Sequence, residues 1–397
     1  MEVRGKIGAA KVTASADSFI PFFRSEGKPT TLSVNEFIKS NSESLSGPGE
    51  LSREVEKLLC EKQGTKMSLL TPSGTSALEL ATLLMEIQSG DEIIMPSWTF
   101  ASTANAFILR GAKIIFVDIE PWTLNMDPVK VEAAISKRTR CIVTINYAGI
   151  PGELELFREL ANSNELLLLE DNAHGFGGKI GEKPLGSFGN MAAQSFHQTK
   201  NLQCGEGGAL SINDEQFLTR AEVLREKGTN RKQFLEGMVD KYTWQDFGSS
   251  FVLSEILAQY LKSNLETFEE SQVRRLQIWK RYESISKDKL ESLGVSVPQV
   301  GIGITPSCHA YWLIFSNFQD SNSFIKYMKA WGGGIEVSRH YVPLHNSPAA
   351  LKFDTFTPGA MLVTEQTGDC LVRLPLYSKL NDSEVEQIIT AVKDFSC

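Results

Sequence analysis

Short apolar runs alternate with amphipathic stretches along the chain from about Leu69. Residues 76–88 (SALELATLLMEIQ) repeat apolar positions at helical spacing, so they predict a helix that ends at Gly90. Further helices are predicted at 102–110, 128–137 and 153–162, and strands at 91–96, 113–117, 141–145 and 165–170. The last of these strands, ELLLLE, is apolar without alternation, as expected of a strand covered on both faces. Strands separated by helices predict an α/β fold with a mainly parallel sheet.

The pattern changes after Gly189, where two predicted strands lie close together in the sequence. These strands are expected at 191–196 and 208–213, a helix at 214–227, later strands at 309–315, 334–338 and 370–373, and a last helix at 382–395. A long charge-rich stretch before Gly294 predicts a helix that connects two domains. We therefore predict an N-terminal extension at 1–19, a large domain at 20–253, a connecting helix at 254–293 and a small α+β domain at 294–397.

Composition narrows the class of protein. The 397 residues are enough for two domains, and 42% of them are hydrophobic. A formal net charge of −8 argues against nucleic acid or an anionic membrane as the main partner. No apolar run approaches the roughly 18 residues that span a bilayer, and residues 1–19 lack the apolar centre of a secretory signal. The six cysteines form no CxxC pair, which predicts no metal site and a cytoplasmic protein with reduced thiols.

A small-residue turn, TPSGTS, opens the predicted helix at 76–88. Free backbone N–H groups and the helix dipole make such a terminus a site for phosphate. The flexible Gly74 and the hydroxyls of Ser73, Thr75 and Ser76 suit the same role. An ordinary helix N-cap explains the turn equally well, because Ser and Thr are common at that position.

Asp171 directly follows the apolar part of the strand predicted at 165–170, in the segment EDNAH. Ligands of parallel sheets bind at the carboxyl ends of the strands. A carboxylate there can pair with a cationic ring nitrogen of a cofactor, and His174 can hydrogen-bond a ring oxygen. The alternative is an aspartate that only caps the next turn.

Lys200 ends the segment SFHQTK in a largely uncharged neighbourhood. A lysine in such surroundings has a lowered pKa and becomes a nucleophile for an aldehyde. Ser195 and His197 point to one side of the strand if it extends that far, and Ser195 could then contact a phosphate. His197 is otherwise a buried core histidine, and Cys204 is interpreted as a packing residue.

Three glycines follow the lysine, in the segment GEGG at 205–208. They allow the backbone to pass close to a bound ring, or they form a plain hairpin turn. The sequence contains no GxGxxG motif, no GxxxxGK[ST] motif and no GxSxG motif. Nicotinamide-dependent, P-loop and α/β-hydrolase chemistry are therefore disfavoured.

Taken in this order, the turn TPSGTS, the segment EDNAH and the phrase SFHQTKN…GEGG resemble the DegT/DnrJ/EryC1/StrS family of sugar aminotransferases. The resemblance covers about residue 20 to the C-terminus. It implies a fold-type I enzyme that uses pyridoxal 5'-phosphate. Family members in which histidine replaces the lysine are dehydratases, so Lys200 favours amino transfer.

The resemblance also implies roles for single residues. Lys200 matches the lysine that binds the cofactor covalently, and Asp171 matches the partner of the ring nitrogen. His174 occupies a position that is usually Gln or His. Phosphate contacts are implied for Gly74, Thr75 and Ser195, with His197 at the same site, and Phe100 in PSWTFAST matches an aromatic residue that stacks on the ring. Core packing is the alternative for Phe100.

The segments REKGTNRKQF, VDKYTW and HYVPLH resemble one subgroup more closely. That subgroup uses glutamate to form dTDP-4-amino-4,6-dideoxy-D-galactose from the 4-keto-6-deoxyglucose nucleotide, for enterobacterial common antigen. The implied nucleotide-binding residues are Lys227, Asn230, Arg231, His340, Tyr341 and His345. A solvated loop is the alternative for the charges of KGTNR.

One segment departs from the family. Where many members have GxNxR, this chain has Gly248-Ser-Ser-Phe-Val, which places Ser250 at the Asn position and lacks the Arg. In the family this segment reaches the neighbouring subunit's phosphate, so we expect a homodimer with shared active sites. The alternatives are another keto-sugar, transfer at C3, or a non-catalytic regulatory protein on the same fold.

Overall fold

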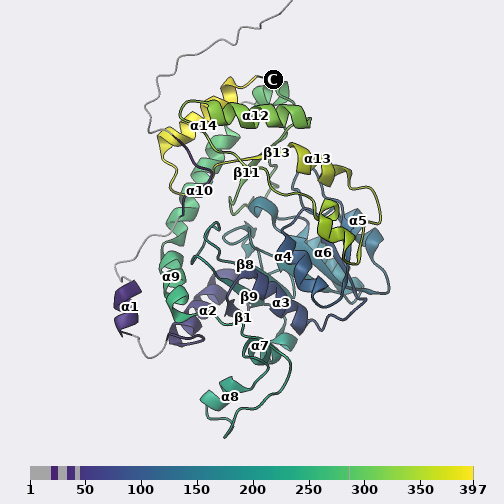
Figure 1. Cartoon of the computed structure of the whole chain (residues 1–397), viewed down its shortest axis with the longest axis vertical. Helices are drawn as coiled ribbons and strands as arrows, with labels where there is room; N and C mark the ends of the chain where they lie inside the picture. Colours follow the sequence, from purple (N-terminus) through teal and green to yellow (C-terminus); the bar gives the residue numbers. More distant parts are fainter. Residues whose placement is uncertain (1–18, 26–33, 41–44, 286, 397) are drawn as a thin grey trace, which may run out of the picture.

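An eight-stranded sheet forms the centre of the chain in the computed structural model, which describes residues 19–25, 34–40, 45–285 and 287–396 (Figure 1). Most of the predicted N-terminal extension, residues 1–18, lies outside the described residues. In spatial order the strands are β1 (Met67–Thr71), β9 (Gly208–Ile212), β8 (Met191–Ser195), β5 (Leu167–Asp171), β4 (Thr139–Ile145), β2 (Glu92–Pro96), β3 (Lys113–Val117) and β12 (Thr355–Phe356).

The direction of the strands confirms the predicted fold class. Strand β9 is antiparallel to both of its neighbours, β1 and β8, and every other neighbouring pair is parallel. The carboxyl ends of β1, β5 and β8 therefore lie at one edge of the sheet. This is the edge at which parallel sheets bind ligands.

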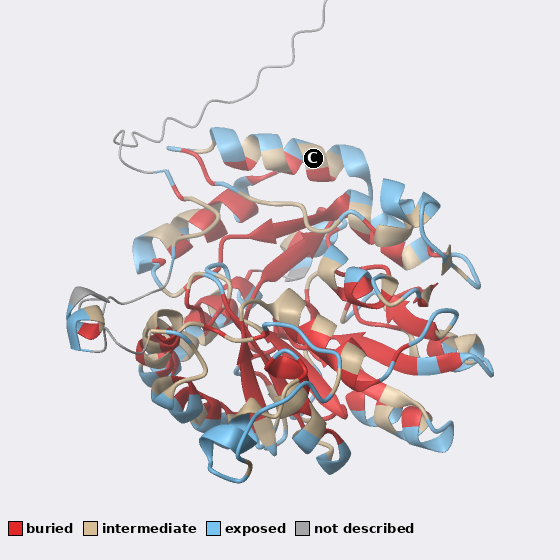
Figure 2. Cartoon of the chain, turned by 60° about the horizontal axis from the view of Figure 1, so that its bottom comes forward, coloured by how far each residue is buried: buried red, intermediate tan, exposed pale blue. Residues whose placement is uncertain are grey.

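Helices cover both faces of this sheet, and Figure 2 shows buried residues along the strands with exposed residues on the outer sides of the helices. These helices are α2 (Glu50–Gln63), α3 (Gly74–Leu84), α4 (Ala101–Ile108), α5 (Pro128–Ala134), α6 (Leu154–Ser163) and α7 (Leu218–Arg225). Neighbouring residues of one strand belong to different apolar layers. Ile114 and Phe116 of β3 pack with α3 and α4, whereas Ile115 packs with Phe157 of α6. Burial on both faces explains the apolar runs without alternation.

The helical stretch predicted at 254–293 is divided into three helices. They are α9 (Glu255–Glu266), α10 (Phe268–Glu283) and α11 (Lys287–Ser292). Thr267 leaves the helical conformation, with φ −105° and ψ 8°. The next side chain, Phe268, is buried and packs edge-on against Phe176, with 5.0 Å between the ring centroids. In Figure 1, α9 lies beside the sheet domain and α10 continues to the C-terminal lobe.

The C-terminal lobe contains an antiparallel strand pair with helices around it. Its elements are β11 (Tyr311–Ile314), β13 (Leu371–Leu374), α12 (Phe318–Ala330), α13 (Leu362–Cys370) and α14 (Asp382–Asp394). The prediction of a strand at 334–338 is wrong. Ile335 and Ser338 form only isolated bridges, to Ile20 and Arg373, because Gly334 has a φ of 100° that turns the backbone away from an extended path.

Several shorter elements were not predicted. They are α1 (Val34–Ser40), α8 (Arg231–Leu235), a sheet of β6 (Lys179–Ile180), β7 (Lys183–Pro184) and β10 (Ile304–Thr305), and 3-10 helices at Tyr147–Gly149, Glu215–Phe217, Leu344–Asn346 and Pro348–Leu351. Strand β12 comes from the C-terminal third of the chain but pairs with β3 of the large sheet.

The described N-terminal residues contact the C-terminal lobe. Ile20 is 1% exposed and packs in the apolar cluster around Trp279, Tyr311 and Phe324.

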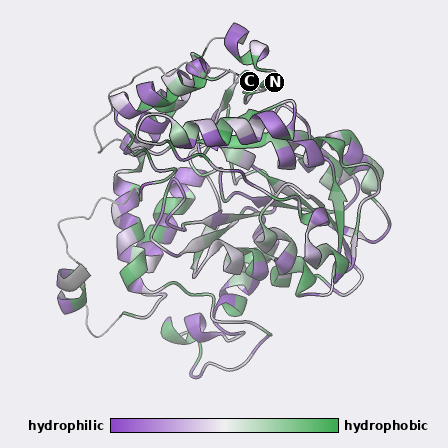
Figure 3. Cartoon of the chain, turned by 45° about the horizontal axis from the view of Figure 1, so that its top comes forward, coloured by the Kyte–Doolittle hydropathy of each residue, from purple (hydrophilic) through white to green (hydrophobic). Residues whose placement is uncertain are grey.

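Hydrophobic residues gather on the strands and on the inner faces of the helices (Figure 3). In the part of the chain that is described, no helix is both long and apolar enough to cross a bilayer.

Candidate active site

A cavity of about 430 Å³ opens at the carboxyl edge of the sheet. Its lining brings together residues from the ends of β1, β2, β5 and β8, the loop before β9, and the C-terminal lobe. The lining consists of Ser73, Gly74, Thr75, Leu78, Thr99, Phe100, Ser102, Ile145, Asp171, Ala173, His174, Ala193, Gln194, Ser195, His197, Thr199, Lys200, Glu206, Gly207, His340 and Tyr341. Residues up to 268 positions apart in the sequence thus meet at one site, from Ser73 to Tyr341 (341 − 73).

Asp171 is the last residue of β5; it is buried and lines the cavity. One carboxylate oxygen accepts a hydrogen bond from the Thr103 hydroxyl at 2.6 Å. The other accepts one from the Ala173 N–H at 3.2 Å. Burial raises the pKa of Asp171, while Thr103, Ala173 and the charge of Lys200 act in the opposite direction. A cation brought against this carboxylate would favour its ionised form.

Lys200 lies in the loop between β8 and β9 and lines the same cavity as Asp171. Burial lowers the pKa of its amine to about 8, against the attraction of Asp171, and the Arg373 charge lowers it further. About one tenth of such an amine is unprotonated at pH 7. The predicted lowering therefore agrees with the structure, and the neutral amine is available as a nucleophile.

His174 is buried between the cavity and a second histidine. Its Nδ1 accepts the Ala148 N–H at 3.3 Å, so the proton of the neutral ring is on Nε2. Nε2 lies 3.4 Å from the Tyr341 hydroxyl. The ring of His309 stacks on His174 at 4.0 Å between centroids. Burial, then the charges of Lys200 and Arg373, lower the pKa of His174 well below its usual value, and the ring stays neutral.

The turn at 73–76 forms the N-terminus of α3. Ser73 is the N-cap, and its hydroxyl accepts the Ser76 N–H at 3.0 Å. Thr75 shares a hydrogen bond of 2.7 Å with Ser102. A Cβ at Gly74 would lie 2.9 Å from the Cβ of Ser195, so only glycine lets the two segments approach this closely. The turn is therefore a helix cap and also a cavity wall of N–H and hydroxyl groups.

Two of the lining residues, Phe100 and His197, had core packing as their alternative interpretation. Phe100 is 57% exposed, so the alternative of core packing is wrong for it. His197 is half-buried rather than in the core; its Nδ1 lies 2.9 Å from the Thr199 hydroxyl, and its Nε2 lies 3.6 Å from Glu206. Cys204 is buried, and burial raises the pKa of its thiol to about 12, in agreement with a packing role.

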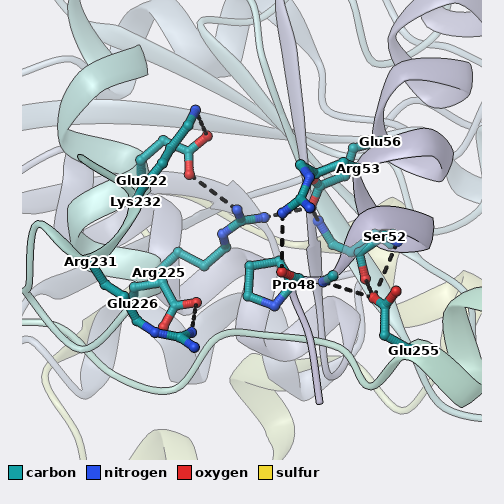
Figure 4. Close-up of polar contacts among 12 residues, drawn as sticks. Pro48, Ser52, Arg53, Glu56, Glu222, Arg225, Glu226, Arg231, Lys232 and Glu255 are labelled. Carbon is teal, nitrogen blue, oxygen red and sulfur yellow. Dashed lines mark hydrogen bonds and ion pairs between the residues drawn. The ribbon is translucent and has the colours of Figure 1, made fainter. Parts of the chain in front are cut away.

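Five of the residues implied by the resemblance lie outside the cavity of their own chain. Lys227 forms an ion pair with Glu226 at 3.3 Å. Arg231 forms another with Glu226 at 3.2 Å (Figure 4). Asn230 accepts the Thr243 N–H at 2.7 Å. His345 hydrogen-bonds Ser97 through Nδ1, also at 2.7 Å. Ser250 is exposed. Of the implied nucleotide-binding residues, only His340 and Tyr341 line the cavity.

Four residues of this site were not predicted from the sequence. Thr103 follows Phe100 by three residues on α4, so helical spacing could have indicated it. Tyr147 donates a hydrogen bond to the His340 carbonyl at 2.8 Å. His309 and Arg373 come from the C-terminal lobe, and no local pattern connects them with Lys200.

Comparison with known proteins identifies the family. Residues 26–393 match the DegT/DnrJ/EryC1/StrS aminotransferase family. The chain belongs to this family. It is therefore a sugar aminotransferase, as the residues around Lys200 predicted.

Several relatives cover almost the whole chain. The spore coat polysaccharide biosynthesis protein SpsC of Bacillus subtilis is 30% identical over 93% of this chain and 94% of its own length. GDP-perosamine synthase of Caulobacter vibrioides is 29% identical over 88% of this chain and 91% of its own. The crystal structure of a family aminotransferase from Brucella abortus superposes with a TM-score of 0.80 at 27% identity, covering 90% and 93% of the two chains.

The cofactor of this aminotransferase family is pyridoxal phosphate, and the cavity fits that group. A buried carboxylate at Asp171 suits a protonated ring nitrogen, and the amine of Lys200 suits the aldehyde. The α3 N-terminus, with Gly74 and Thr75, suits the phosphate. Phe100 offers an exposed ring as a stacking surface.

Proposed function

We propose that this aminotransferase moves an amino group from glutamate to C4 of a nucleotide-linked 4-keto-6-deoxy sugar. The proposed substrate is dTDP-4-dehydro-6-deoxy-D-glucose, and the product is dTDP-4-amino-4,6-dideoxy-D-galactose. The product would serve surface polysaccharide synthesis of the O-antigen or enterobacterial common antigen type. The single observation that supports amino transfer best is the meeting of Lys200 and Asp171 across one cavity.

The choice of sugar is supported by sequence. The segments around Lys227 and His340 resemble the subgroup with that product. Two relatives are named for polysaccharide synthesis and for GDP-perosamine. The second name supports testing GDP-linked as well as dTDP-linked sugars. The described cysteines are free, which supports a reducing, cytoplasmic location.

Lys200 is proposed to move the proton in each half of the reaction. When bound, the cofactor supplies the electron sink that makes the α-carbon of glutamate acidic. The Nζ of Lys200 then accepts the α-proton, because its lowered pKa leaves neutral amine near physiological pH. The same amine, once protonated, can donate a proton to carbon. In the second half of the reaction the carbon that receives it is C4 of the sugar.

The neighbouring residues are proposed to orient and to stabilise the cofactor ring. Asp171 presents a fixed carboxylate to the ring nitrogen, because Thr103 and Ala173 hold both of its oxygens in place. His174 offers a neutral Nε2–H as a donor to the ring oxygen. With the cofactor bound, Phe100 would cover one face of the ring and exclude water from it.

A homodimer is part of the proposal. The last residue of α8 and the segment after it expose large apolar side chains: Leu235 is 63% exposed, Met238 69% and Trp244 80%. Contiguous exposed apolar surface of this kind is typical of a protein interface. The segment protrudes from the lower end of the chain in Figure 1. We propose that a second copy covers it, and that Ser250 and the KGTNR residues then act at the partner's cavity.

Incubation with glutamate and a panel of nucleotide keto-sugars tests the proposal. The panel contains 4-keto-6-deoxy and 3-keto-6-deoxy sugars, each linked to dTDP and to GDP. NMR of the product gives the position and stereochemistry of the amine. Formation of the 4-amino-galactose product from the dTDP substrate supports the proposal. A 3-amino product, a preference for another sugar, or no product from any sugar of the panel contradicts the assigned substrate.

A further inference from the structure

Glu206 lines the cavity, but its side chain has no part in the proposed mechanism. Apart from the histidines, the acidic and basic residues of the lining are Asp171, Lys200 and Glu206, and the first two already have roles. The Glu206 side chain is 69% exposed, and its ion-pair partner among the described residues is His197. The carboxylate is therefore available to a molecule that enters the cavity.

The backbone places Glu206 directly opposite His197. Beyond the ends of β8 and β9 the antiparallel register of Ser195 with Gly208 continues, with backbone hydrogen bonds of 2.8 Å on either side of the pair His197–Glu206. The pair itself is of the non-hydrogen-bonded kind, in which facing side chains lie closest together. Alternation along the strand directs Ser195 and His197 to the same side, and both line the cavity. The two facing side chains therefore project into the cavity together.

The imidazole of His197 orients the carboxylate. Its Nδ1 accepts the Thr199 N–H at 3.4 Å, so the ring proton lies on Nε2, the atom that faces Glu206. A carboxylate has about four lone-pair sites, so one such neighbour leaves others free to accept from a ligand. Lys200 lies in the same turn, because its backbone N–H donates to the His197 carbonyl at 2.9 Å. The carboxylate is thus held beside the turn that bears the reactive amine.

The negative charge of Glu206 restricts which part of a substrate it suits. A carboxylate repels the phosphates of a nucleotide and the carboxylates of glutamate. It accepts hydrogen bonds strongly from hydroxyl groups, since bonds to an ionised acceptor are short and strong. In the sugar of the proposed reaction, the two carbons next to the reacting C4 differ: C3 bears a hydroxyl and C5 bears a methyl group. The nearest hydroxyl to the reacting carbon is therefore the one on C3.

We propose that Glu206, oriented by His197, binds the C3 hydroxyl of the sugar and so selects sugars that carry it. Glu206 contacts the substrate, and His197 is a positioning residue that acts through it. A site built to hydrogen-bond a hydroxyl rejects an analogue that lacks this group, because the polar group of the site is left unpaired. Glutamate has no such hydroxyl, so the first half of the reaction does not need the pair. The inference rests on the proposed function, because it concerns the sugar of that same reaction.

Glu206→Ala in the holoenzyme tests the contact. Absorbance of the cofactor is followed after mixing with the amino-sugar product, dTDP-4-amino-4,6-dideoxy-D-galactose, in the half-reaction that needs no glutamate. The amino-sugar concentration for half-maximal rate should rise about 10- to 100-fold, as expected for a lost hydrogen bond to a charged group. Glu206→Gln, which keeps the shape of the side chain without its charge, should give an intermediate rise. With glutamate in place of the amino sugar, the half-saturating concentration should change less than about threefold.

Glu269→Ala is the matched control. It removes a carboxylate of similar exposure, 74%, which pairs with Lys62 at 2.7 Å and lies on α10 outside the cavity lining. Both half-saturating concentrations should stay within about threefold of the parent's.

The 3-deoxy analogue of the amino sugar separates a contact with the hydroxyl from a general effect. The parent should need about 10- to 100-fold more of the analogue than of the amino sugar, whereas Glu206→Ala should distinguish the two less than about threefold. His197→Phe should raise the amino-sugar concentration about three- to tenfold in the parent and little further in Glu206→Ala, since the histidine acts through the carboxylate.

Three results would overturn the contact: unchanged amino-sugar saturation in Glu206→Ala, an equal change with glutamate, or a parent that does not distinguish the 3-deoxy analogue. The last of these needs no variant, so it stands even if a substitution disturbs folding. A parent that is converted by glutamate but not by the amino sugar would overturn the proposed substrate together with the contact.

Discussion

Lys200 shows how far the surroundings of one residue determine its chemistry. The chain contains 40 lysine and arginine residues, and most of the described ones lie at the surface. Lys200 differs because burial, a facing carboxylate and a nearby guanidinium act on a single amine. The sequence around it indicated the burial and the carboxylate. It could not indicate Arg373, which lies 173 positions away (373 − 200).

Lys200→Ala should abolish turnover. The variant should still bind pyridoxal phosphate without a covalent link, because the phosphate wall and Asp171 remain. Loss of a proton-transferring group predicts a fall in rate of about 10³-fold or more. Turnover with glutamate is the measurement, and Lys66→Ala, which removes an exposed lysine paired with Glu215, is the control. Near-normal turnover in Lys200→Ala would contradict the assignment.

The pH dependence of cofactor capture reports on the same amine. Only the neutral form attacks an aldehyde, and the pKa of Lys200 is lowered to about 8. Mixing apoprotein with pyridoxal phosphate between pH 6 and 10 should therefore give a capture rate that rises with pH and levels off above about 8. In Arg373→Met the midpoint should move upward, because a neighbouring positive charge is gone. A midpoint near 10.5, the value of an ordinary lysine, would contradict the buried environment.

At the scale of elements, the apolar pattern predicted the central strands better than the ends of helices and the elements of the C-terminal part. The strand at Lys113–Val117 was predicted with its observed bounds, because both faces are buried and the run is apolar throughout. The helix at 128–137 ends at Ala134. Strand β12 and helices α12 and α13 escaped notice because their burial depends on partners far away in the sequence. The cavity residues at strand ends were predictable from the pattern. In the C-terminal lobe, His340 and Tyr341 were indicated only by the family resemblance, and His309 and Arg373 were not indicated at all.

Asp118 joins two such distant elements. It follows β3, and one of its carboxylate oxygens accepts hydrogen bonds from the N–H and hydroxyl of Thr364 at 2.8 and 2.7 Å, at the start of α13. The other oxygen accepts one from Lys130 at 3.0 Å. Although burial acts to raise it, these bonds lower the pKa of Asp118. The carboxylate therefore stabilises the fold at neutral pH, and this contribution is lost as the pH falls through the lowered pKa.

Asp118→Asn should lower the free energy of unfolding by about 1–3 kcal/mol at pH 7, because buried donors lose a charged acceptor. Denaturant unfolding of the holoenzyme measures the change. The difference between variant and parent should shrink as the pH is lowered, since the parent carboxylate is then protonated too. Glu132→Gln on neighbouring α5 removes an exposed carboxylate and should leave the unfolding free energy unchanged. A pH-independent difference would contradict the role of the charge.

At the scale of the whole molecule, the apolar segment after α8 predicts assembly. Met238→Glu together with Trp244→Glu should convert a dimer to a monomer, because two charges would be buried at the interface. Analytical ultracentrifugation measures the mass. Ile302→Glu, at another exposed apolar side chain, is the control and should leave the assembly unchanged. A double variant that stays dimeric would place the interface elsewhere.

The backbone that bears the reactive amine is fastened to the other lobe. Asn201, the next residue after Lys200, donates its side-chain amide to the Ser307 carbonyl at 2.7 Å and shares a bond of 2.9 Å with His309. Those two residues lie where the chain enters the C-terminal lobe. His309 in turn stacks on His174. We therefore expect a change in the path of this segment to reach the lysine and the histidine together.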